Sequence, residues 1–185
     1  MAIRNRVVSR ILFLGGVLLL AEGSFSVYPF LFPAAGEVEV SAAPTVSTAN
    51  ARFEPGSHLF RLSFSRQKAT FDVVEGTTKK SLRIGPGHLA GSSMPGSVGN
   101  SVIAGHRDTH FRVLKDVVVG DEIRIDAGPQ RYLYRIVDTR IVPPTDISSL
   151  HPSVDSVLTL ITCYPFYFMG PAPDRFVVRA KAVEK

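Results

Sequence analysis

The chain contains no tryptophan and a single cysteine among its 185 residues. One cysteine cannot form an internal disulfide or build a cysteine-rich metal site, so disulfide scaffolds and zinc ribbons are excluded. Charged residues make up only 20% of the chain, and the net charge is +5. No basic run is interleaved with aromatic residues, as a groove for single-stranded nucleic acid requires. We therefore expect no nucleic-acid partner. The basic excess is either a solvated surface or an attraction to anionic lipid or cell envelope.

Hydrophobic residues make up 45% of the chain, which indicates a globular protein rather than a disordered one. A length of 185 residues fits one domain. Thirteen prolines and fifteen glycines divide the apolar residues into short runs. This punctuation favours a fold built from short β-strands.

The N-terminal region has the pattern of an export signal. Three arginines within the first ten residues precede an apolar stretch, Ile11–Ala21, and apolarity resumes at Phe25–Phe32 after Glu22. A basic flank of this kind keeps the N-terminus in the cytoplasm. We predict that residues 1–35 form this flank and a signal-anchor or transmembrane segment. The protein would then cross the cell membrane once, with its remaining residues on the extracytoplasmic side. The alternative is a cleaved signal peptide, whose apolar core has about 7–15 residues.

Residues 36–52 are rich in Ala, Ser, Thr, Val and Pro, and we predict a flexible linker there. The folded domain is expected to span residues 53–185. Period-two alternation and short apolar runs predict strands near residues 59–64, 69–74, 101–104, 122–126, 132–142, 156–163 and 175–179. Gly85–His88 is assigned to a loop, and Ser81–Ile84 to one helical turn. Such a β-rich pattern predicts either a closed barrel or a sandwich. Val157–Ile161 is apolar enough to be a central strand.

Three reactive side chains fall at the ends of predicted strands. Cys163 closes one strand-like run, His106 closes an earlier one, and Arg175 opens the last. A cysteine nucleophile reacts as its thiolate, and an imidazole can accept the thiol proton and later protonate a leaving amine. A guanidinium stays charged and can stabilise negative charge that develops on a carbonyl oxygen. These residue types predict cysteine-based acyl transfer.

The segments around these residues resemble those of a known family. Thr159–Cys163 (TLITC) resembles the TLxTC signature of sortases, the cysteine transpeptidases of bacterial surfaces. Ala104–Thr109 resembles the segment around their catalytic histidine, and Asp174–Val178 the segment around their catalytic arginine. Gly105–Phe111 and Cys163–Phe166 look most like class D sortases.

The resemblance implies an eight-stranded β-barrel, all-β apart from short helices, behind the N-terminal anchor. It also implies a cysteine-type transpeptidase and endopeptidase with Cys163 as nucleophile, His106 as acid and base, and Arg175 as stabiliser of substrate and oxyanion. Thr162 is expected to hydrogen-bond the substrate backbone. The implied partners are secreted proteins with a C-terminal LPxTG-like sorting motif, an amine nucleophile from peptidoglycan or a pilin, and the cytoplasmic membrane. No acidic cluster resembles a calcium site, so no metal or other cofactor is expected.

Two alternatives use the same residues differently. A non-catalytic envelope adaptor on a sortase-like barrel would keep Cys163 buried and inert. A cysteine L,D-transpeptidase of peptidoglycan would need a Ser-His-Gly-Cys segment, whereas Ile161 and Thr162 precede Cys163 here.

Overall fold

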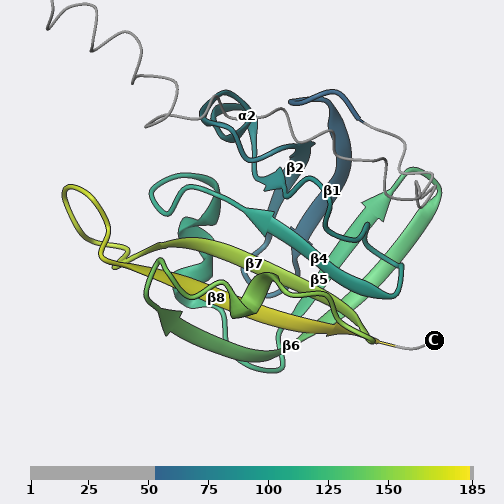
Figure 1. Ribbon diagram of the computed structural model, residues 1–185. Helices are drawn as coiled ribbons and strands as arrows, with labels where there is room; N and C mark the ends of the chain where they lie inside the picture. Colours follow the sequence, from purple (N-terminus) through teal and green to yellow (C-terminus); the bar gives the residue numbers. More distant parts are fainter. Residues whose placement is uncertain (1–52, 184–185) are drawn as a thin grey trace, which may run out of the picture. The chain divides into compact units, whose positions relative to one another are not determined.

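Strands dominate the part of the chain that the computed structural model describes, residues 53–183 (Figure 1). The strands are β1 (His58–Phe64), β2 (Ala69–Glu75), β3 (Gly87–His88), β4 (Gly99–Ala104), β5 (Glu122–Ala127), β6 (Gln130–Val142), β7 (Ser156–Tyr164) and β8 (Asp174–Ala182). The helices are short: α2 (Lys79–Ile84) and two 3-10 segments, η1 (His110–Asp116) and η2 (Ser148–Leu150).

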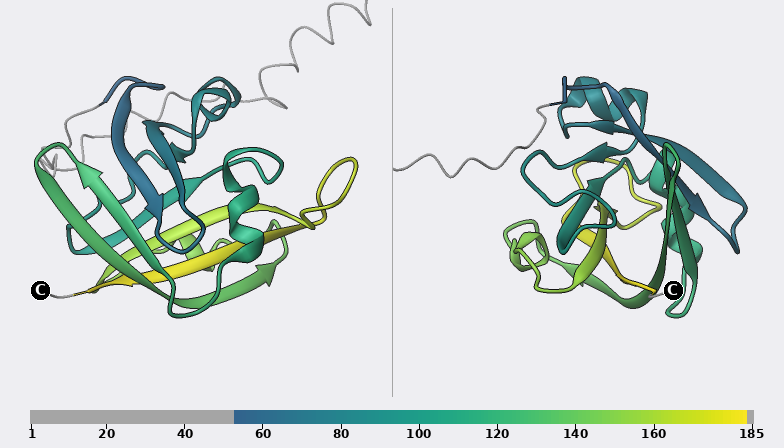
Figure 2. Two further views of the ribbon diagram at one scale, coloured as in Figure 1. Left: turned by 180° about the vertical axis from the view of Figure 1, so that it is seen from behind. Right: turned by 90° about the vertical axis from the view of Figure 1, so that its right-hand side faces the viewer.

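The eight strands close into a barrel in the order β1-β2-β3-β4-β7-β8-β6-β5. The ring is completed by antiparallel pairing of β5 with β1. Most neighbours are antiparallel, but β2–β3 and β4–β7 run parallel. The closed barrel is therefore confirmed over the sandwich. The views in Figure 2 show the strands curving around a common interior.

β7 is the central strand that its sequence predicts. It lies between β4 and β8, and Val157, Leu158 and Leu160 are almost completely buried. Alternate residues of β1 point inward in the same way. These side chains join a single core with Phe60, Leu62, Phe64, Ile103, Phe111, Leu114, Ile123, Ile125, Tyr134, Ile136, Leu158, Leu160 and Val178 among its members. The core fixes the barrel wall rigidly, so groups at its strand ends are held in place.

The structure differs from the sequence-based expectations in several places. Gly87–His88, assigned to a loop, forms the short strand β3, which is parallel to β2 and antiparallel to β4. η1 was not predicted. β4 ends at Ala104, so His106 follows the strand rather than closing it. The β6–β8 register shifts between Ile136 and Asp138, an irregularity of the kind that bends a strand.

α2 begins earlier than the single turn predicted from the sequence. Thr78 is its N-cap, and its hydroxyl accepts a hydrogen bond from the Ser81 main-chain N–H. Such a cap satisfies one of the N–H groups that the first helical turn leaves without a partner.

The predicted anchor at 1–35 and linker at 36–52 lie outside the described residues. Among residues 53–183, no helix has the length and apolarity needed to cross a bilayer.

Candidate active site

Strand pairing places Cys163 directly opposite Arg175. The two residues are partners in the antiparallel β7–β8 ladder, next to the pair Tyr164–Asp174 that ends it. Opposite residues in such a ladder have Cα atoms about 4.5–5.5 Å apart. Both side chains are half-buried. In this structure Arg175 Nη1 donates to the carbonyl oxygens of Asp174, at 2.8 Å, and Ala172, at 3.4 Å.

His106 follows β4 at the same end of the barrel. β4 runs parallel to β7, with Ala104 opposite Ile161, and the Gly105 N–H continues the ladder by donating to the Ile161 carbonyl at 3.1 Å. The next residue, His106, is exposed. Because parallel neighbours end on the same side, this turn brings the imidazole-bearing segment to the end of β7 that carries Cys163.

The turn that carries His106 is fixed by Phe111. The Phe111 N–H donates to the His106 carbonyl at 2.9 Å, and its fully buried ring lies against Gly105. A Cβ atom at Gly105 would lie 2.6 Å from Cγ of that ring, which is too close for any side chain. Glycine at position 105 is thus what allows the ring to pack directly beneath the histidine turn.

Thr162 connects the histidine turn to the cysteine strand. Its hydroxyl donates to the Gly105 carbonyl at 2.7 Å, and the residue is 2% exposed. The hydroxyl hydrogen of Thr162 is therefore donated to another group of the protein. The substrate contact expected of Thr162 stays a prediction, and the observed contact is one that holds the two segments together.

The loop between β7 and β8, residues 165–173, projects beyond this end of the barrel (Figure 1). At its base the ring of Phe166 packs against those of Tyr164 and Phe176, with centroids 5.9 and 5.4 Å away. Its tip is open, and Tyr167 and Met169 are 74% and 97% exposed. The contact that sequence reasoning missed is Arg107, whose guanidinium donates to loop carbonyls.

Two other histidines differ in their roles. His110 lies near this end of the barrel, where burial and the positive charge of His106 lower its pKa. His88 is buried, with Nδ1 3.0 Å from a Glu75 carboxylate oxygen and Nε2 2.9 Å from the Ser92 hydroxyl. Its polar atoms are satisfied within the barrel wall. Among residues 53–183, no group of three or more His, Cys, Asp or Glu side chains is arranged to hold a metal ion.

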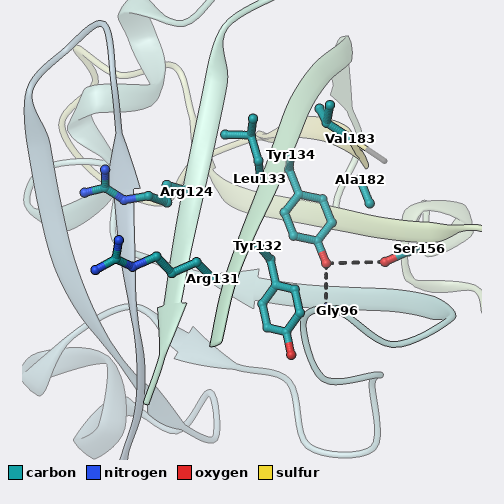
Figure 3. A pocket seen from close by; sticks show the side chains of 9 residues that line it. All are labelled: Gly96, Arg124, Arg131, Tyr132, Leu133, Tyr134, Ser156, Ala182 and Val183. Atoms are coloured by element: carbon teal, nitrogen blue, oxygen red, sulfur yellow. Dashed lines mark hydrogen bonds between the residues drawn. The ribbon is translucent and has the colours of Figure 1, made fainter. Parts of the chain in front are cut away.

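A pocket of about 700 Å³ lies away from these residues, at the other end of β7 (Figure 3). Its lining includes Ser156, the first residue of that strand, whereas Cys163 is near the last. With a rise of about 3.3 Å per residue, the two ends are roughly 20 Å apart. Tyr134 Oη accepts the Gly96 N–H there at 2.8 Å and lies 3.4 Å from the Ser156 hydroxyl. This pocket is separate from the candidate active site.

Comparisons with known proteins agree on one family. Residues 62–183 match the model of the sortase domain. The chain is 37% identical over 125 residues to sortase D of Bacillus subtilis (strain 168), a match that covers 66% of this chain and 62% of that protein. The aligned part thus spans less than two thirds of that relative's length.

Two solved structures are similar to the chain. A Clostridium perfringens sortase D5 transpeptidase superposes with a TM-score of 0.66 and 28% identity, over 72% of this chain and 83% of that one. Sortase A from Corynebacterium diphtheriae superposes with a TM-score of 0.65 and 32% identity, over 72% of this chain and 64% of that one.

Proposed function

The chain belongs to the sortase family of cysteine transpeptidases, and on that premise we propose that Cys163 is its nucleophile, His106 its acid and base, and Arg175 its oxyanion stabiliser. The observation that carries this proposal is the register of the barrel. It sets Cys163 opposite Arg175 and continues the β4–β7 ladder to the residue before His106. The three residue types supply a nucleophile, a proton carrier and a fixed positive charge at one strand end.

The reaction we propose has two acyl-transfer steps. The Cys163 thiolate attacks the carbonyl carbon of the threonine in a sorting motif, and the carbonyl oxygen takes the negative charge. The C–N bond to the next residue then breaks as protonated His106 gives its proton to the leaving amine, which leaves a thioester on Cys163. In the second step an incoming amine loses a proton to His106 and attacks the thioester, and the sulfur departs as the thiolate. The products are a new amide and the original enzyme.

The Arg175 guanidinium supports this scheme by its position. In the structure it binds carbonyl oxygens of its own strand end, at 2.8 Å in the case of Asp174. Those acceptors are neutral, so a substrate oxyanion would be a stronger partner for the same donors. We propose that Thr162 serves the site both by the contact to Gly105 and by main-chain hydrogen bonds to the substrate.

The substrate, partners and location are also part of the proposal. We propose a membrane-anchored class D-like sortase whose catalytic domain, residues 53–185, faces outward. It would act on secreted proteins with a C-terminal LPxTG-like motif and transfer them to an amine of peptidoglycan or of a pilin. The supporting observations are the basic and apolar N-terminal pattern and the similarity to sortase D.

A cleavage assay tests the function. The full chain in detergent is incubated with LPxTG-, LPNTA- and LAxTG-type peptides, with and without an amine such as triglycine, and the products are weighed by mass spectrometry. We expect cleavage after threonine, an amide product only when the amine is present, and neither product from a folded Cys163→Ala variant. Turnover by that variant would remove the mechanism. A half-buried Cys163 already disfavours the inert adaptor, which needs the thiol inaccessible.

A further inference from the structure

The loop that joins β7 to β8 has almost no main-chain support of its own. Outside the strands, no hydrogen bond between main-chain groups of residues 53–183 involves any residue of 165–173. Its tip is apolar and exposed, with Tyr167, Phe168 and Met169 at 74%, 45% and 97%. A nine-residue segment without such hydrogen bonds would ordinarily be among the least stable parts of a fold. Some other contact has to hold it in place.

Arg107 supplies three of the hydrogen bonds that do so. Its Nη1 donates to the Pro165 carbonyl at 3.1 Å, and its Nη2 donates to the carbonyls of Phe168 at 2.8 Å and Gly170 at 3.0 Å. The guanidinium carbon also lies 5.7 Å from the centre of the Phe168 ring. One side chain thus binds the first residue of the loop and two residues in its middle at the same time.

The position of Arg107 gives these contacts a consequence for the site. It directly follows His106, and the loop that it binds connects the strand of Cys163 to the strand of Arg175. Arg175 in turn donates to the Ala172 carbonyl at the far end of the same loop. Arg107 therefore links the segment of His106 to the loop 165–173. Cys163 lies two residues before that loop and Arg175 two residues after it.

We propose that Arg107 is a positioning residue that clamps residues 165–173 against the His106 segment and so keeps the loop in place as a wall of the peptide-binding site. The role in peptide binding rests on the proposed function, whereas the clamp itself does not. A planar guanidinium holds its donors in a fixed fork that fits three separated carbonyls, whereas an ammonium group is a compact point charge on a flexible stem without that fork. A preformed wall spares the substrate the cost of ordering the loop on binding.

The experiment compares Arg107→Gln and Arg107→Lys with the wild-type full chain in detergent. Limited chymotrypsin digestion, mapped by mass spectrometry, reports cleavage after Tyr167 and Phe168, because a protease needs the loop to detach and extend. We expect both variants to be cleaved at least about tenfold faster, since the loop would lose its tether while the barrel stays folded. Thermal unfolding confirms that each variant is folded.

Arg112→Gln is the matched control. Arg112 carries the same charge and lies over the Tyr167 ring, with its guanidinium carbon 5.5 Å from the ring centre, but it contributes no hydrogen bond to the loop carbonyls. We expect its cleavage within about twofold of wild type, because a single exposed cation–π contact is weak. With a sorting peptide, we expect the Arg107 variants to raise KM about tenfold and change kcat by less than about threefold, the pattern of lost uniform binding.

The outcomes separate the clamp from the function. Unchanged loop cleavage in both Arg107 variants, or equal acceleration in Arg112→Gln, overturns the clamp. Faster loop cleavage with an unchanged KM overturns the role of the loop as a binding wall. If wild type turns over no peptide, the proposed function fails, and the digestion rates still decide whether Arg107 holds the loop. Should Arg107→Gln not fold, Arg107→Lys keeps the charge and carries the same comparison.

Discussion

Gly105→Ala is the substitution that most sharply tests how the histidine turn is held. The main chain at Gly105 is not in the positive-φ region, so alanine can adopt its conformation and only space is limiting. The added methyl group would lie 2.6, 2.7 and 3.1 Å from three atoms of the Phe111 ring. Carbon atoms pack at about 3.5–4.0 Å, so ring and backbone must separate by roughly 1 Å.

The size of the effect of Gly105→Ala depends on whether the Phe111 ring or the main chain of the histidine turn moves. Phe111 is fully buried in the core, and forcing its ring outward is overpacking, which costs about 1–3 kcal/mol of unfolding free energy. The Phe111 N–H also binds the His106 carbonyl at 2.9 Å, so movement of either group shifts the histidine. A misplacement of about 1 Å costs on the order of 100-fold in rate. We expect a loss of about 1–3 kcal/mol in stability together with a drop of about 10–100-fold in kcat/KM.

Urea unfolding and peptide cleavage by Gly105→Ala, Phe111→Leu and the double variant provide the assay. Leucine makes room for the methyl group, so the double variant should be more stable than the sum of the single effects by at least about 1 kcal/mol. It should also regain part of the activity lost in Gly105→Ala. Strictly additive stabilities, or a Gly105→Ala protein with wild-type stability and turnover, would refute the account of this turn.

Three further predictions concern other groups. Arg175→Lys should lose at least about 100-fold in kcat/KM in the cleavage assay, because a point charge does not replace a planar fork, and near-normal rates would reduce Arg175 to a structural role. Iodoacetamide should alkylate Cys163 in the folded protein and abolish turnover, whereas a thiol that resists the reagent would favour the adaptor. Hydrogen bonds from Arg66, at 2.7 and 2.8 Å, lower the pKa of Asp121 from 3.8 to about 2. The ionised carboxylate therefore stabilises the fold fully above about pH 4, and this contribution is lost as the pH falls toward 2. Asp121→Asn should therefore lower the free energy of unfolding in urea by about 1–2 kcal/mol near pH 7, a value reduced because Arg66 is half-exposed. The difference in stability between the variant and wild type should disappear between pH 4 and 2. A difference that does not depend on pH would contradict the assignment.

The strands next to the candidate site were the most predictable part of the fold. The apolar run before Cys163 is central and buried on both faces, and the run after Arg175 is its antiparallel neighbour. Both have strong local patterns, since a strand covered on both sides needs continuous apolar residues. The closed barrel itself was implied by the family resemblance, because short strands alone fit a sandwich equally well.

The missed features depend on contacts between distant segments. Gly87 and His88 form a strand although the Gly-Pro-Gly signal predicts a loop, because their ladder partners are supplied by β2 and β4. A Cβ atom at Gly87 would lie 2.2 Å from the Gly76 carbonyl oxygen, so glycine serves close backbone approach rather than a turn. The contacts of Arg107 with the loop could not be predicted from the sequence either, because their acceptors are main-chain carbonyls, which every residue has. The hydrogen bond from the buried Thr162 hydroxyl to the Gly105 carbonyl was also not anticipated, and the substrate contact of Thr162 stays a prediction.

The central claim is that Cys163 carries the acyl group of a sorting motif. Its most direct test is the intact mass of the full chain, quenched in acid during turnover of a sorting peptide and then digested to locate any adduct. The account predicts a mass increase equal to the threonine-terminated fragment less water, placed on Cys163 and released by an added amine. Turnover with no adduct on Cys163, or an adduct on another residue, would contradict it.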